Sequence, residues 1–345
     1  MLSVLGIVPV LLVFQLLGSA ILAQCHFVAS RSIPDDHLVK FQLFAQYSAA
    51  AYCDHNNDDG ILGSTIAEFN EEDIRGFVAV DDTHRLLIVS FRGSNSVRNW
   101  IKNFQFWKID EPGPRGFWDK LFGSDKPQRG NDICSCGIHT GFYRSWQLLK
   151  SDVMDALTRA RETHNDYHVV VTGHSLGAAI ATIAGAYLRT MHIPCDIYSY
   201  GSPRVGDARF AEFVSSQQGL TARITHGYDP VPSLPPMSLF GIYDLGYRHI
   251  WPEYWISGLS LNGTDTIKVC RGLENLSCNG TRQTGFSFEI EDHRNYLGHI
   301  TACGPKFTYR DMDESWSAED LDRLRMLAGN DTFFATHYIS NGTGV

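Results

Sequence analysis

The stretch that decides the fold is Gly173-His174-Ser175-Leu176-Gly177, which lies between an apolar run and a run of small residues. Val169-Val170-Val171 before it is a short continuous apolar segment, as in a buried strand. Residues 178–189 after it are rich in alanine, as in a helix. Strand, tight turn and helix in this order are the context that a nucleophile elbow requires. The pattern predicts Ser175 as a nucleophile; an ordinary glycine-rich strand-to-helix turn is the alternative.

The segments around this turn alternate between helix and strand patterns. Apolar residues at helical spacing predict helices over 38–52, over 145–162 and from 210 onward. Apolar and β-branched runs predict strands over 77–80, 86–91, 196–200 and 222–224. Strands that alternate with helices form a mainly parallel sheet with helices on both faces, so the expected fold class is α/β.

Composition and charge limit what the chain can be. Its 345 residues are 43% hydrophobic and 19% charged, which excludes a disordered chain, a collagen-like repeat and a multi-span membrane protein. The formal net charge is −9, and no Lys- or Arg-rich run occurs. A negative surface repels phosphate backbones, so we expect no nucleic-acid partner.

The N-terminus is typical of a secreted protein. Residues 1–23 carry no charged side chain, Val4–Leu17 is almost entirely apolar, and small residues follow it. This predicts a signal peptide cleaved after Ala20 or Ala23; an uncleaved signal anchor is the alternative. Eight cysteines, an even number, suit an oxidising compartment. Five glycosylation sequons are present, at Asn262, Asn275, Asn279, Asn330 and Asn341.

A serine nucleophile needs a histidine base and a carboxylate that orients the histidine. On an α/β scaffold the chain order is serine, acid, histidine. Asp229 is the best acid, because it follows the predicted strand 222–224 where the end of the strand would present it. The histidines downstream are His249, His293, His299 and His337. Spacing does not choose among them, although His337 is the poorest candidate.

The oxyanion of an acyl-transfer intermediate needs preorganised donors. One expected donor is the backbone N–H of Leu176, directly after the nucleophile. The other is Ser94, in the loop after the predicted strand 86–91. The segment that follows has one apolar stripe at helical spacing, made of Val97, Trp100, Ile101 and Phe104. This short helix is either a surface helix facing the core or a lid over the serine.

With these motifs the chain resembles the fungal class 3 triacylglycerol lipases of the Thermomyces type, with feruloyl esterases as a side branch. The similarity runs from Leu38 to Cys303. It passes through Phe41–Cys53, Phe91–Ser94, Asn99–Ile101, Gly141–Phe142, the Ser175 elbow, Ser199–Gly201, Pro203–Gly206, Asp229 and Pro252–Ile256. The resemblance implies the α/β-hydrolase fold, with a mostly parallel central sheet and helices on both faces.

The resemblance also implies the site. It selects His293, in Asp292–Gly298, to complete a triad with Ser175 and Asp229, and it keeps Ser94 and Leu176 as the oxyanion hole. It places Trp100 on a lid. The residues implied to border the acyl pocket, for which plain core packing is the alternative, are Tyr52, Phe142, His174, Val231 and Leu234.

The family's disulfides suggest three pairs here: Cys53 with Cys303, Cys134 with Cys136, and Cys270 with Cys278. One residue lies between Cys134 and Cys136 where the lipases have two, and the third pair is found in some feruloyl esterases. Cys25 and Cys195 have no counterpart.

The expected organisation is a signal peptide (1–23), a lead segment (24–37), the lipase domain (38–303) and a C-terminal extension (304–345). An insertion covers 111–131. Within the extension, Ser317–Asp320 is a capping box that opens a short helix, and the remainder is expected to be a partly mobile appendage.

The expected function is a secreted serine esterase that hydrolyses acylglycerols at lipid–water interfaces through an acyl-enzyme. Its expected partner is a lipid ester, with transient contact to the lipid surface through the lid. No cofactor or metal is expected, because the sequence has neither HExxH nor a His/Cys cluster at ligand spacing. The alternatives are a feruloyl esterase and a catalytically inactive hydrolase-fold binding module.

Overall fold

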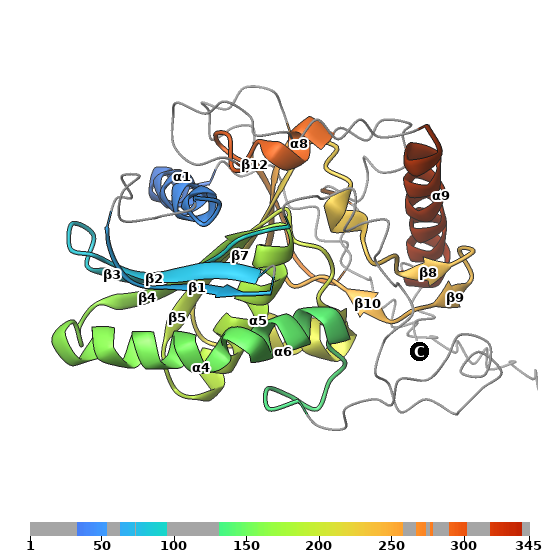
Figure 1. The fold of residues 1–345 in the computed structure, drawn as a ribbon. Coiled ribbons are helices and arrows are strands. Elements are labelled where there is room, and N and C mark those ends of the chain that lie inside the picture. The colour runs from blue at the N-terminus through green and yellow to red at the C-terminus, as the bar shows by residue number, and fades with distance from the viewer. Residues whose placement is uncertain are drawn as a thin grey trace, which may run out of the picture.

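The computed structural model describes residues 33–53, 63–72, 74–94, 131–257, 267–273, 277–278, 290–301 and 318–339. These residues form three layers, with a twisted sheet between helices (Figure 1). The helices are α1 (Asp35–Ala50), α4 (Thr140–Thr163), α5 (Leu176–Thr190), α6 (Ala208–Ser216), η1 (Val231–Ser233), α8 (Ile290–Arg294), α9 (Ala318–Phe334) and η3 (Ala335–Ile339). The strands are β1 (Ser64–Glu71), β2 (Ile74–Asp81), β3 (Leu86–Phe91), β4 (His168–His174), β5 (Cys195–Tyr200), β6 (Gly206–Asp207), β7 (Thr221–His226), β8 (Ser238–Leu239), β9 (Tyr243–Asp244), β10 (Tyr247–Arg248), β11 (Glu253–Ile256) and β12 (Ile267–Cys270).

The main sheet has eight strands in the order β1-β2-β3-β4-β5-β7-β11-β12. The first three strands form an antiparallel meander, whereas β3, β4, β5, β7 and β11 run parallel to one another and β12 closes the far edge antiparallel to β11. The parallel strands therefore all end at one edge of the sheet. Ligands of open α/β sheets bind at this carboxyl edge.

Helices cover both faces of the sheet (Figure 1). α1 packs on one face, against β3, β4 and β5, while α4 and α5 pack on the other. α4 buries one stripe of side chains, among them Phe142, Trp146, Leu149, Val153 and Leu157. Each large apolar side chain buried in this way stabilises the fold by roughly 1.5–3 kcal/mol. The two apolar cores, one per face, hold the strand ends in fixed positions.

The predicted helices and strands up to β7 are present, with small shifts at their ends. α1 begins at Asp35, so the expected lead segment 24–37 overlaps the first turn of the helix. The sequence patterns did not predict β1, β11, β12 or α8. β11 lies in the run Pro252–Ile256, which entered the sequence analysis only as a matching motif.

The C-terminal extension contains a helix that packs on the body of the protein. It follows the predicted capping box: α9 spans 17 residues and packs against β8. The partly mobile tail beyond this helix stays a prediction. Leu324 is only 2% exposed and belongs to the main core, and Phe334 packs on Met237. Apolar residues at one side of α9 therefore attach this helix to the body of the protein, beside β8 and β9 (Figure 1).

Several expectations fall on residues that the structure does not describe. They are the signal peptide, the lid stripe with Trp100, the 111–131 insertion except for its last residue, Cys25, Cys303, Asn262, Asn275, Asn279 and Asn341. Cys53 is disulfide-bonded, and its pairing with Cys303 stays a prediction. Cys134 is joined to Cys136, and Cys270 to Cys278. Cys195 is a free, buried thiol, and Asn330 lies half-buried on α9.

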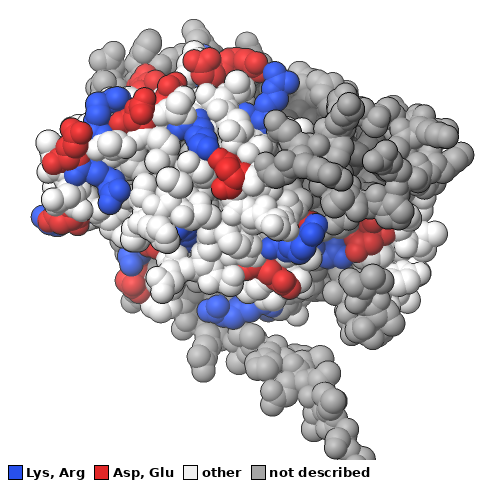
Figure 2. Space-filling view, turned by 90° about the horizontal axis from the view of Figure 1, so that it is seen from below, with Lys and Arg blue, Asp and Glu red and all other residues white. Residues whose placement is uncertain are grey.

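The surface carries mixed charges. The face seen in Figure 2 shows acidic and basic side chains side by side over much of its described area. Among the surface ion pairs, Arg144 lies 3.6 Å from Glu72, and Lys150 pairs with Asp132. Within the described ranges, no helix is long and apolar enough to cross a membrane.

Candidate active site

Ser175 lies at a sharp turn between β4 and α5, at the carboxyl edge of the sheet. Its backbone has φ 57° and ψ −126°, a conformation that an L-residue rarely adopts, and its N–H donates to the carbonyl of Tyr200 at 2.9 Å. A Cβ on Gly173 would overlap the backbone of Gly177, and a Cβ on Gly177 would overlap that of Phe91 and Arg92. Both glycines of the quoted pentapeptide are thus required by backbone packing, which is the reason the turn can lift Ser175 above the strand.

Asp229 and His293 form a buried pair beside this turn. The two side chains are 0% exposed, and His293 Nδ1 lies 2.8 Å from Asp229 Oδ2. Asp229 is presented by the turn after β7, and its Oδ1 accepts the N–H of Val231 at 2.8 Å. His293 comes from α8, which is tied to the same turn because Asp292 Oδ2 accepts the N–H of Tyr228 at 2.7 Å.

This geometry fixes the tautomer of His293. A carboxylate only accepts hydrogen bonds, so Nδ1 carries the proton that it donates to Asp229, and Nε2 of the neutral ring is left with a lone pair. Among the described residues, neither His293 Nε2 nor Ser175 Oγ has a hydrogen-bond partner, although both are buried. A buried acceptor and a buried hydroxyl without partners at one site are the arrangement expected of a base and a nucleophile that wait for substrate.

His174, adjacent to the nucleophile, supports the backbone of His293. Its Nε2 lies 2.8 Å from the carbonyl oxygen of His293 and must donate to it, so its Nδ1 accepts the hydroxyl proton of Tyr52 at 2.8 Å. Burial holds the pKa of His174 well below its ordinary value, as does the neighbouring His293. His174 is therefore neutral, and it ties the nucleophile turn to the base.

Tyr296 is a site residue that the sequence reasoning missed. Its buried hydroxyl donates to Asp229 Oδ2, the same oxygen that His293 contacts. Burial, and then the charge of Asp229, raise the pKa of Tyr296 well above its usual value, so the phenol stays protonated and donates. The only signal in the sequence is its spacing of three residues from His293, which is too common to have indicated this role.

The expected oxyanion donors lie close to the nucleophile. Leu176 is the first residue of α5, so its N–H has no carbonyl of the same helix to bind and lies at the positive end of the helix dipole. Ser94 follows β3, which pairs with β4 in parallel so that Phe91 is opposite Gly173. A Cβ on Gly93, next to Ser94, would lie 3.0 Å from Ser175 Cβ. Both donors therefore come from neighbouring strand ends at one edge.

The structure also locates the predicted acyl-pocket residues and the other histidines downstream of Asp229. Val231 and Leu234 are fully buried in the loop after Asp229, and Phe142 is buried in the core under α4. His249 is buried, and its Nε2 donates to the carbonyl of Pro232 at 2.7 Å; burial lowers the pKa of His249 well below the ordinary value. His299 and His337 are exposed. Of the four downstream histidines, His293 is thus the one that contacts Asp229. Trp100 lies outside the described part of the chain.

In the part of the chain that the structure describes, no group of three or more His, Cys, Asp or Glu side chains could hold a metal ion. The site described above consists of a serine, an imidazole and a carboxylate.

The chain is similar to known lipases in sequence and in fold. Residues 88–239 match the family described as Lipase (class 3). A secreted mono- and diacylglycerol lipase from Fusarium solani is 36% identical over 85% of this chain and 85% of its own length. A secreted mono- and diacylglycerol lipase from Penicillium cyclopium is 33% identical over 81% of this chain and 92% of its own. The crystal structure of a mono- and diacylglycerol lipase from Aspergillus oryzae superposes with a TM-score of 0.64 at 32% identity, covering 79% of this chain and all of that one.

Proposed function

The chain belongs to the class 3 lipase family, and from this premise we propose that Ser175, Asp229 and His293 hydrolyse acylglycerol esters through an acyl-enzyme. It is a carboxylic ester hydrolase of the α/β-hydrolase fold. The observation that carries the assignment of residues is the fully buried His293–Asp229 contact of 2.8 Å beside the Ser175 turn.

The proposed reaction has two halves, acylation of Ser175 and hydrolysis of the acyl-enzyme. His293 Nε2 takes the proton of Ser175 Oγ as that oxygen attacks the ester carbonyl, and Asp229 stabilises the imidazolium that forms. The N–H of Leu176 and donors of Ser94 bind the oxyanion. The ester C–O bond breaks, and His293 returns the proton to the leaving glyceride oxygen. Water then attacks the acyl-enzyme by the same steps and releases the fatty acid and free Ser175.

The substrate class follows from the relatives. The names of the Fusarium and Penicillium proteins state mono- and diacylglycerol as their substrates. We therefore expect this enzyme to accept partial glycerides as well as triacylglycerols. Val231 and Leu234, buried directly after Asp229, and Tyr52, Phe142 and His174 are the side chains that we assign to the acyl side of the site.

Secretion and interfacial contact belong to the same proposal. The apolar uncharged N-terminus, the paired cysteines and the word "secreted" in the names of the relatives support an extracellular enzyme. The apolar stripe of Val97, Trp100, Ile101 and Phe104 is assigned to a lid that contacts the lipid surface.

One experiment tests the catalytic residues. A fluorophosphonate probe should label the folded protein at Ser175, and Ser175→Ala should remove the label while the circular dichroism spectrum stays unchanged. Absence of labelling in the folded wild type would favour the inactive binding module.

A second experiment tests the substrate. Hydrolysis of tributyrin, dibutyrin and monobutyrin should be compared with that of methyl ferulate, below and above the solubility limit of tributyrin. We expect glycerides to be preferred, with a rise in rate when an interface forms. A preference for soluble ferulate without any interfacial gain would replace the lipase by a feruloyl esterase.

A further inference from the structure

The loop that carries the catalytic acid is buried but has little regular structure. We call residues 229–238 the acid loop. All ten positions are buried, and only the three-residue turn η1 is helical. Backbone N–H and C=O groups that are buried outside helices and sheets need other partners. The acid loop must therefore be held by side chains from elsewhere.

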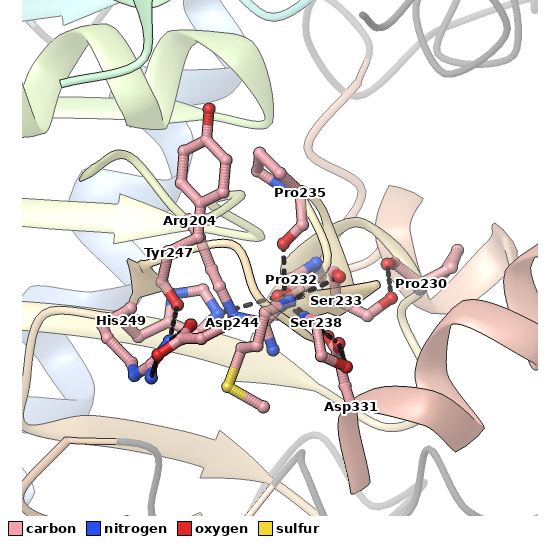
Figure 3. A network of polar contacts seen from close by, with 12 residues as sticks. Arg204, Pro230, Pro232, Ser233, Pro235, Ser238, Asp244, Tyr247, His249 and Asp331 are labelled. Carbon is pink, nitrogen blue, oxygen red and sulfur yellow. Dashed lines mark hydrogen bonds and ion pairs between the residues drawn. The ribbon is translucent and has the colours of Figure 1, made fainter. Parts of the chain in front are cut away.

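Arg204 supplies the donors for the carbonyl groups of this loop. Its Nη1 donates to the carbonyl oxygens of Ser233 at 2.7 Å and Pro235 at 2.8 Å (Figure 3). Its backbone N–H donates to the carbonyl of Leu234 at 2.7 Å. The guanidinium is almost completely buried, with 3% of its side chain exposed. A buried cation needs a buried anion beside it.

That anion is Asp331 of the C-terminal helix α9, with 2% of its side chain exposed. Its Oδ2 accepts from Arg204 Nη1 at 3.1 Å and from the N–H of Met237 at 2.9 Å. Its Oδ1 accepts the N–H of Ser238 at 2.9 Å and the hydroxyl of the same serine at 3.2 Å. Figure 3 shows Asp331 extending from α9 to Ser238. One carboxylate thus binds the end of the acid loop and the arginine that holds its middle.

The other end of the acid loop is the catalytic carboxylate itself. Asp229 Oδ1 accepts the N–H of Val231, and η1 connects Val231 to the anchored residues because the N–H of Leu234 donates to the carbonyl of Val231 at 3.0 Å. The path from Asp331 to Asp229 is therefore a continuous series of short contacts within a fully buried segment.

We propose that Asp331 is a positioning residue for the reaction: through Arg204 and the acid loop it sets the carboxylate of Asp229 against His293. Asp331 touches neither the substrate nor the reacting atoms. The inference rests on the proposed triad. It assigns to the C-terminal extension a role in catalysis, in addition to its packing on the body of the protein.

The test variant is Asp331→Asn. Asparagine keeps the shape but replaces one acceptor oxygen with an NH2 group, which then faces an N–H donor of Met237 or Ser238 or the guanidinium of Arg204. The acid loop must shift to relieve this contact. The matched control is Asp322→Asn on the same helix, because Asp322 is exposed and pairs only locally with Arg325 at 2.8 Å.

The readouts separate positioning from general support. With soluble p-nitrophenyl butyrate we expect Asp331→Asn to lower kcat about tenfold with KM within twofold, because a displaced Asp229 weakens a transition-state interaction and leaves ester binding unchanged. The low-field proton resonance of His293 Nδ1–H, shared with Asp229, should shift in Asp331→Asn. Amide exchange of the peptide covering 230–238 should accelerate. Asp322→Asn should leave all three unchanged.

Two results would overturn the proposal: an unchanged kcat in folded Asp331→Asn, or a lower kcat with an unshifted Nδ1–H resonance.

If Asp331→Asn does not fold, Ser238→Ala provides the test, since it removes only the hydroxyl that donates to Asp331 Oδ1. It should lower kcat about threefold and shift the resonance in the same direction, and an unaltered enzyme would refute the role. The proton resonance and the amide exchange rates can be measured without turnover. They therefore test the positioning role of Asp331 even if the wild type proves inactive, which would instead refute the proposed function.

Discussion

Asp229 Oδ2 is shared by two donors, His293 Nδ1–H and the hydroxyl of Tyr296. The second donor restricts the rotation of the carboxylate and partly neutralises it. A carboxylate fixed in this way keeps the imidazole of His293 in the tautomer whose Nε2 can accept a proton.

Replacing Tyr296 with phenylalanine should therefore lower kcat. The ring packing is kept and one charge-assisted hydrogen bond is lost, which corresponds to about 1.5 kcal/mol and a rate about tenfold lower. Steady-state hydrolysis of p-nitrophenyl butyrate measures the change. The matched control is Tyr200→Phe, whose hydroxyl donates to the carbonyl of Phe41 at 2.6 Å instead of to the triad. An equal loss in both variants would contradict the role of Tyr296.

Gly201 gives a second expectation at this scale. It has φ 57°, and a Cβ there would lie 2.9 Å from Asp229 Oδ2, 3.0 Å from Tyr296 Oη and 3.1 Å from His293 Nδ1. Gly201→Ala should displace the imidazole and lower kcat about a hundredfold, the scale expected for a small misplacement of catalytic groups. Gly219→Ala, also at positive φ but facing Arg189, should destabilise the protein without this loss of kcat at permissive temperature.

Some site residues could be predicted from the sequence and others could not. Residues that belong to a local sequence pattern were found, whereas residues that meet only in the folded protein were not. Ser175 and Leu176 follow from a local pattern, and Asp229 from its position after a predicted strand. His293 could not be separated from His249 by spacing, because only the tertiary fold decides which imidazole meets the acid. Asp331 had no signal at all, since an aspartate in a polar helix near the C-terminus is ordinary in every respect except its burial.

At the scale of elements, β4 and β5 are linked by an ion pair near their N-terminal ends, at the edge of the sheet opposite the active site. His168 Nε2 lies 3.0 Å from Asp196 Oδ2, and Asp196 Oδ1 accepts the N–H of Leu220 at 2.7 Å. The hydrogen bond to Asp196 raises the pKa of His168 above its ordinary 6.5, against the smaller opposing effect of burial. This contact fixes the register at which two central strands begin.

The sign of the pH dependence follows from that shift. The pKa of His168 is higher in the folded state than in the unfolded chain. The contact with Asp196 therefore stabilises the folded state fully below about pH 6.5, and this contribution is lost as the pH rises through the folded-state pKa of His168. His168→Asn should therefore reduce the free energy of unfolding by about 0.5 kcal/mol more at pH 5.5 than at pH 9, a small effect because the imidazole is 47% exposed. Urea titrations measure it. His192→Asn on an exposed turn should show no such difference, and a pH-independent loss in His168→Asn would rule out the ion pair.

Elements were predictable where apolar periodicity is strong. β3, β4, α5 and β5 have long runs of buried residues, and α1 and α4 bury residues at helical spacing, so the sequence patterns indicated all six. β1 alternates exposed and half-buried positions because one face is open to solvent, and β12 is short and at an edge. α8 has only five residues, fewer than any periodicity can reveal, although it carries His293, the histidine that we propose as the base.

At the scale of the whole molecule, β5 lies between β4 and β7 at the centre of the sheet, and Cys195 at its start is 0% exposed. Burial raises the pKa of the Cys195 thiol to about 11. A thiol that is both inaccessible and protonated does not react with alkylating agents. Only the opening of the central sheet exposes it.

Alkylation of Cys195 should therefore report global unfolding. Iodoacetamide at pH 8 should not modify Cys195 in the native protein. In urea the modified fraction of the Cys195 peptide, measured by mass spectrometry, should follow the loss of circular dichroism. The Cys270 and Cys278 peptides should remain unmodified without a reductant, as a control for their disulfide. Modification of Cys195 at full native ellipticity would show a local opening of β5 instead.

The attachment of the acid loop to α9 has a consequence for biosynthesis. A ribosome makes the chain from its N-terminus, and Ser238 is synthesised 93 residues before Asp331, the partner of its amide. The nascent polypeptide can complete its sheet early, yet the tie that orients the catalytic acid has to wait for α9 to emerge from the exit tunnel. We expect a translation product arrested before α9 to be folded at its centre but poor at turnover.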